Sequence, residues 1–94
     1  MIRAVWDGKN LILEGHAKFD EYGKDIVCAA VSFTSQYVAY LLERLGAEFE
    51  KEKGRLVVRN IGSDDFSKMV VELFIESLRV IERKYPKSLK VEVI

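Results

Sequence analysis

The stretch IRAVWDGKNLILEG, residues 2–15, contains two short apolar runs that meet at Asp7 and Gly8. Asp-Gly is a favoured pair in the tight turns that join antiparallel strands, and apolar runs bounded by such a pair are typical of a β-hairpin. We therefore expect a hairpin that ends at Gly15. The rest of the chain supplies the elements that pack against it or extend it.

Two helices are predicted from apolar residues that recur at spacings of three and four. The first spans Asp25 to Leu45, with Asp25 as its expected N-cap and Gly46 as its stop. Its recurring apolar residues are Ile26, Ala30, Phe33, Tyr37, Leu41 and Leu45. The second begins at Ser63 and ends before Pro86, and its stripe is expected to pack in the core: Phe66, Met69, Val70, Leu73, Phe74, Leu78 and Ile81.

The strands complete the expected fold. A second hairpin is predicted from residues 47–51 and 56–61, with its turn near Gly54. One face of its first arm is acidic, which suits a solvated edge strand. The alternating sequence LKVEVI, residues 89–94, predicts a last strand. The order is ββαββαβ, an α+β two-layer sandwich in which two helices cover a mostly antiparallel sheet, and residues 1–94 form one domain.

Composition limits the function. The 94 residues include 15 basic and 15 acidic ones, so no general field draws in phosphate backbones and direct nucleic-acid binding is not expected. The single cysteine forms no intramolecular disulfide, which favours a reduced thiol and a cytoplasmic location. We find no apolar core of signal-peptide length, and we expect no run long enough to span a membrane.

The only histidine and the only cysteine lie in one stretch, GHAKFDEYGKDIVCAAVS, residues 15–32. His16 follows a predicted strand, Cys28 falls in the first turn of the predicted helix, and a loop over residues 17–24 is long enough to bring them together. A helix N-terminus and a neighbouring imidazole both favour a thiolate. The unpaired N–H groups of the first turn are also suited to stabilising an oxyanion.

A structural interpretation of these two residues stands beside the catalytic one. Free cysteines are among the most buried residues, and Cys28 lies in the apolar run IVCAAV. The alternative function is therefore a non-catalytic interaction module with a buried thiol. A metal centre is poorly supported because Cys28 and His16 supply two ligands, whereas structural zinc needs four. No cofactor or metal is expected.

The same stretch resembles the signature of the ribosomal-processing cysteine proteases, the Prp family. That signature is Gly-His, a loop ending in Gly, and then Asp-x-Val-Cys-Ala-Ala-x-Ser, which residues 15–32 match. The resemblance implies a homodimeric endopeptidase that removes a hydrophobic N-terminal extension from a large-subunit ribosomal protein of the L-twenty-seven type. It also implies a Cys28 nucleophile and a His16 general base. For the non-catalytic alternative, the resemblance implies a ribosome-associated interaction module. The matching supporting positions are Gly15, Asp25 and Ser32.

Several roles within the motif stay open. Asp25 either caps the helix or orients His16, and Ser32 either contacts the thiolate or substrate or bonds back to the Cys28 carbonyl. Gly15 and Gly23 are expected to serve backbone geometry. The loop departs from the family pattern at Lys18, Phe19 and Asp20. The candidates for a substrate loop, as opposed to a plain surface loop, are Phe19, Tyr22 and Gly23.

Overall fold

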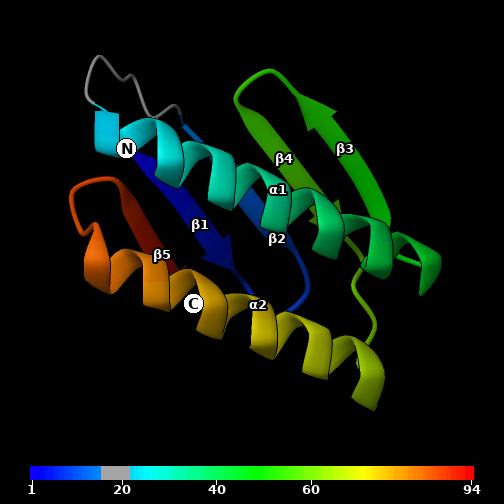
Figure 1. The fold of residues 1–94 in the computed structure, drawn as a ribbon. Helices are drawn as coiled ribbons and strands as arrows, with labels where there is room; N and C mark the ends of the chain where they lie inside the picture. Colours follow the sequence, from blue (N-terminus) through cyan, green and yellow to red (C-terminus); the bar gives the residue numbers. More distant parts are fainter. Residues whose placement is uncertain (16–21) are drawn as a thin grey trace.

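The computed structural model describes residues 1–15 and 22–94, with residues 22–25 described by their backbone only (Figure 1). The elements follow the expected order ββαββαβ. They are β1 (Ile2–Trp6), β2 (Leu11–Glu14), α1 (Tyr22–Arg44), β3 (Glu48–Glu52), β4 (Arg55–Arg59), α2 (Asp65–Lys84) and β5 (Leu89–Val93).

One five-stranded sheet carries both helices on the same face (Figure 1). Its strand order is β3-β4-β2-β1-β5; the β1–β5 pair is parallel and the other three pairs are antiparallel. The prediction of a mostly antiparallel sheet under two helices is therefore confirmed. The acidic strand β3 lies at an edge, as expected, and its glutamates are exposed.

Local turn chemistry accounts for the ends of the first hairpin and of α1. The Asp7 carboxylate accepts hydrogen bonds from the backbone N–H groups of Lys9 and Asn10, at 2.9 and 2.7 Å. After α1, the N–H of Ala47 donates to the carbonyl of Leu42, and the N–H of Gly46 donates to that of Glu43. This pair of bonds is the Schellman arrangement, in which a glycine ends a helix.

The start of α1 differs from the prediction. The helix begins at Tyr22, so Asp25 lies in its first turn and is not the N-cap. Acidic residues are favoured throughout the first turn as well as at the cap, because both positions face the positive end of the helix dipole. The sequence pattern therefore could not separate the two positions. Tyr22 and Gly23 belong to the helix and not to the preceding loop.

The α1 side chains that suggested the helix mostly face away from the sheet. Ile26, Phe33 and Tyr37 are 54%, 74% and 60% exposed. The side that packs in the core is a different one: Val27, Val31, Val38, Ala39 and Leu42. Because α1 is apolar on both sides, its periodicity predicts a helix correctly but does not show which side contacts the sheet.

The predicted core stripe of α2 is only partly buried. Val70, Phe74 and Leu78 are in the core, with Val71 beside them, whereas the structure leaves three predicted core residues exposed: Phe66, Met69 and Leu73. The helix also starts later than predicted. Its N-cap is Asp64, not Ser63, and the Asp64 carboxylate accepts the backbone N–H of Ser67 at 3.1 Å.

The expectation that no apolar run is long enough to span a membrane is wrong, judged by length and composition. Residues Ile26–Arg44 of α1 are long and apolar enough to cross a bilayer, with a mean hydropathy of 1.3. A core helix of a soluble protein passes the same test, and one side of this segment packs against the sheet. Its high hydropathy arises because the opposite side is apolar too.

Candidate active site

The end of β2 is held by close backbone contacts at Gly15. Its N–H donates to the carbonyl of Gly54 at 3.0 Å, which joins β2 to the turn between β3 and β4. Its φ is +107°, and a Cβ added here would overlap the carbonyl oxygen of Met1. A side chain is therefore excluded for both conformational and steric reasons. The expected backbone role of Gly15 is confirmed.

This strand end leads directly into His16. The histidine lies outside the described residues, together with Lys18, Phe19 and Asp20, so the pairing of His16 with Cys28 stays a prediction. The structure does describe Gly15, the residue before His16. Gly15, the last described residue before His16, and Cys28 both line one pocket.

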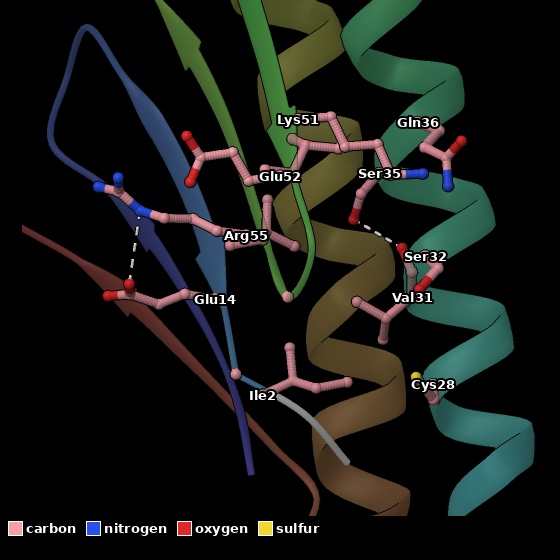
Figure 2. A pocket seen from close by; sticks show the side chains of 14 residues that line it. Ile2, Glu14, Cys28, Val31, Ser32, Ser35, Gln36, Lys51, Glu52 and Arg55 are labelled. Atoms are coloured by element: carbon pink, nitrogen blue, oxygen red, sulfur yellow. Dashed lines mark hydrogen bonds and ion pairs between the residues drawn. The ribbon is translucent and has the colours of Figure 1, made fainter. Parts of the chain in front are cut away.

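Cys28 lies one turn deeper in α1 than predicted. It is the seventh residue of a helix that begins at Tyr22, about 9 Å along the axis from that start. The unpaired N–H groups of the helix belong to residues 22–25, because later residues use theirs within the helix. The expected oxyanion donors of the first turn are therefore not adjacent to the thiol along the helix. Cys28 is half-buried, and Figure 2 shows its sulfur facing the pocket.

The pocket has a volume of about 220 Å³ and lies between α1 and the sheet. Its apolar surface comes from one side chain in each of four elements: Ile2, Leu13, Val31 and Leu56. Three polar residues of α1 continue from Cys28 along one wall: Ser32, Ser35 and Gln36. The opposite wall is formed by the β3–β4 hairpin, with Lys51 at the rim, whereas the side chain of Arg55 extends away from the pocket toward Glu14 (Figure 2).

Some polar side chains around the pocket are already bonded within the protein, and others, as far as the structure describes the chain, are free to bind a ligand. The buried Ser35 hydroxyl donates to the carbonyl of Val31 at 2.6 Å and is therefore committed. Ser32 is exposed, and within the described part of the chain its hydroxyl makes no hydrogen bond, so the alternative bond to the Cys28 carbonyl is not seen. The ion pair of Arg55 with Glu14, at 3.6 Å, is half exposed and hence weak.

Lys51 differs from Arg55 and Glu14, which pair with each other. Among residues 1–15 and 22–94 it has no ion-pair partner, and Figure 2 shows its side chain extending across the pocket toward α1, where Ser35 and Gln36 lie. Sequence reasoning missed these three residues. A signal was present in α1, where positions 28, 32, 35 and 36 carry thiol, hydroxyl or amide groups at helical spacing in a largely apolar stretch.

The arrangement suits chemistry on a peptide. A half-buried thiol opens onto an apolar pocket whose rim carries hydroxyl, amide and ammonium groups. An apolar side chain fits the interior, and the rim groups are able to hydrogen-bond a main chain. A thiol that lines such a pocket is not the fully buried, inert thiol of the alternative interpretation.

Comparison with known proteins places the chain among proteases. A family model described as "Cysteine protease Prp" matches residues 2–90. Two curated Staphylococcus aureus proteins named "Ribosomal processing cysteine protease Prp" are 30% identical to this chain over 87 residues, which cover 86% of this chain and 82% of each relative.

Solved structures share the fold over nearly the whole chain. The essential ribosomal processing protease Prp from S. aureus, solved in complex with a substrate peptide, aligns with a TM-score of 0.82 at 20% identity and covers 99% of this chain and 97% of its own. The same protease with a covalently linked product peptide gives a TM-score of 0.81 at 21% identity over the same shares. SMU.848 from Streptococcus mutans gives 0.77 at 26% identity, covering 100% of this chain and 94% of its own.

Proposed function

The chain belongs to the cysteine protease Prp family, and on that premise we propose that it is an endopeptidase with a Cys28–His16 dyad that removes the hydrophobic N-terminal extension of a large-subunit ribosomal protein. The observation that carries the proposal is the half-buried Cys28 thiol facing an apolar pocket, which is also lined by Gly15 at the strand end that leads into His16. The thiol is placed where an apolar peptide segment has room to bind.

In the proposed reaction, the His16 imidazole takes the proton of the Cys28 thiol, and the thiolate attacks the carbonyl carbon of the scissile bond. A carbon–sulfur bond forms, and the carbonyl π-electrons move onto oxygen. When the carbon–nitrogen bond breaks, the imidazolium returns its proton to the leaving amine. A water molecule, deprotonated by His16, then attacks the thioester, and the reaction releases a carboxylate product and the Cys28 thiol.

The relatives support the choice of substrate class. The S. aureus protease has been solved with a substrate peptide and with a covalently linked product peptide, and the curated relatives are named for ribosomal processing. In this chain the interior of the pocket is apolar, which suits a hydrophobic extension. We place the activity in the cytoplasm, where a lone thiol stays reduced, and, because 15 basic residues balance 15 acidic ones, we propose no direct binding of nucleic acid.

The test uses a synthetic peptide that matches the N-terminus of the host's extended ribosomal protein, with products identified by mass spectrometry. We expect one cut by the wild type and none by Cys28→Ala. Circular dichroism should show the variant folded, since the change removes one small half-buried atom. Ser77→Ala on the exposed side of α2 is a matched control and should cut normally. A cut that survives Cys28→Ala, or no cut by the wild type, would contradict the proposal.

We also propose that the protein is a homodimer, as the family resemblance implies. Its two helices lie side by side on one face of the sheet (Figure 1) and leave apolar side chains facing outward. We call these residues the outer helix face: Ile26, Phe33, Tyr37 and Tyr40 of α1, and Phe66, Met69 and Leu73 of α2. Monomeric proteins seldom expose so many neighbouring apolar groups, and stripes at spacings of three and four are suited to helix–helix packing.

A second copy is the occupant that this face fits best, because an isologous interface requires only that the face be complementary to itself. Sedimentation equilibrium at micromolar concentration should give a dimer for the wild type and a monomer for Phe33→Glu. Lys68→Glu, also on an exposed position of α2, is the charge-change control and should stay dimeric. A monomeric wild type, or a dimeric Phe33→Glu, would exclude this interface.

A further inference from the structure

A buried position of α1 that lines the pocket holds a small residue, Ser35. The side of α1 that packs toward the sheet carries Val27, Val31, Val38 and Leu42, and Ser35 lies within that series at 4% exposure. A branched apolar side chain at this position would extend into the space that the pocket now occupies (Figure 2). The size of residue 35 therefore controls how much of the pocket stays open.

The hydroxyl of Ser35 does not explain why a serine is buried there. It donates to the carbonyl of Val31, four residues earlier in the same helix, at 2.6 Å. That bond satisfies the hydroxyl, but it joins no other element, and such bonds within a helix add little to its stability. What distinguishes serine from the neighbouring valines at this point is its lack of bulk.

We propose that Ser35 is a specificity-determining residue, which sets the depth of a subsite for one bulky apolar side chain of the peptide. The inference rests on the proposed protease function and extends it to substrate selection. The subsite interior is formed by the buried residues Ile2, Leu13 and Leu56 together with Val31. The whole pocket, of which this subsite is the apolar part, has a volume of about 220 Å³, and an apolar cavity of about 150 Å³ holds a benzene ring.

Helix geometry locates the subsite relative to the cut. Ser35 is seven residues beyond Cys28, a distance of about 10 Å along the helix axis. An extended peptide advances about 3.3 Å per residue, so a side chain in this subsite belongs to a residue two or three positions from the scissile bond. The Ser32 hydroxyl and the Gln36 amide lie along the same wall, where the main chain of that peptide would pass.

The experiment varies enzyme and peptide together. Peptides carrying Ala, Leu or Phe at each position two or three residues from the cut are compared by kcat/KM for wild type, Ser35→Val and Ser35→Ala. We expect the wild type to prefer Phe over Ala at one position by at least about tenfold, the scale on which apolar pockets discriminate side-chain size. Ser35→Val should lower that Phe-to-Ala ratio about tenfold, mainly through KM.

Ser35→Ala separates bulk from hydrogen bonding, because it removes the hydroxyl but adds no volume. Its Phe-to-Ala ratio should not fall below that of the wild type. Ser77→Val applies the same chemical change to an exposed position of α2 and should leave the ratio unchanged. Alkylation of Cys28 by iodoacetamide, a small reagent, should proceed at similar rates in all variants, because the subsite lies beyond the thiol.

The protease function and the subsite assignment are overturned by different results. If the wild type cuts no peptide, the protease function itself is wrong. If the wild type cuts but Ser35→Val lowers kcat/KM equally for Ala, Leu and Phe peptides, or leaves every ratio unchanged, the subsite assignment is overturned. Should Ser35→Val prove unfolded by circular dichroism, Ser35→Thr adds a single methyl group and retains the hydroxyl. An unchanged Phe-to-Ala ratio in that folded variant would overturn the assignment equally.

Discussion

Replacing Gly15 by alanine tests how closely the N-terminal residue packs at the end of β2. Two costs add at this position. The first is conformational, because φ is +107° and a residue with a Cβ pays about 1–2 kcal/mol in the left-handed region. The second is steric, because the new Cβ overlaps the carbonyl oxygen of Met1, and forcing an extra carbon into a packed site costs about 1–3 kcal/mol.

The expected loss for Gly15→Ala is therefore about 2–5 kcal/mol of unfolding free energy, out of roughly 5–15 kcal/mol for a typical domain. Gly8→Ala is the matched control. Its φ is +94°, but nothing lies within 4 Å of the added Cβ, so only the conformational cost of about 1–2 kcal/mol applies. Urea unfolding of both variants isolates the steric difference. Equal losses in the two variants would refute the close packing of Met1 against Gly15.

The same variant bears on catalysis because Gly15 immediately precedes His16. Relief of the overlap has to move either residue 1 or the end of β2, and a shift of the latter would displace His16, the general base that we propose. Misplacement of a catalytic group by about 1 Å costs up to about 100-fold in rate. We expect kcat/KM of folded Gly15→Ala to fall at least about tenfold, while Gly8→Ala retains wild-type cleavage. Normal cleavage by Gly15→Ala would show that β2 does not position His16.

Three further substitutions test the role of Asp25, the Arg3–Glu92 ion pair and the packing of the core. Asp25→Asn should keep the thermal midpoint within a few degrees, since Asp25 is not the N-cap, yet lower peptide turnover strongly if its carboxylate orients His16; unchanged turnover would leave a two-residue dyad. The hydrogen bond from Arg3 lowers the pKa of Glu92, so this ion pair stabilises the fold above about pH 4.5 and stops doing so as the pH falls. Glu92→Gln should therefore lose less unfolding free energy than the wild type on acidification, measured by urea unfolding across pH. Equal losses in the two proteins would show that the pair contributes nothing. Leu78 is a buried residue of α2, 1% exposed, so Leu78→Ala should lower the unfolding free energy by about 2–5 kcal/mol, measured by urea unfolding. A loss below about 1 kcal/mol would contradict its place in the core.

The order of the elements was predictable because it depends on short-range chemistry. The pair Asp7 and Gly8 forms the first turn, Gly46 ends the first helix, and the second hairpin turns near Gly54, all as local preferences predict. Each of these signals involves residues within a few positions of one another, so no distant contact is needed to interpret it. The same holds for the spacing between His16 and Cys28, which carries the resemblance to the protease family.

The side of each helix that packs in the core was decided only by the tertiary structure. The first helix offers two apolar sides, and the one containing Phe33 faces outward while the one containing Val31 meets the sheet. The pocket depends likewise on distant partners, since Ser35 opens a space only because Leu13 and Leu56 line its other side. Gly15 is required because Met1, which directly precedes the paired strand β1, lies against it. Local patterns report what a segment can form, whereas burial and close approach depend on chain segments that meet only after folding.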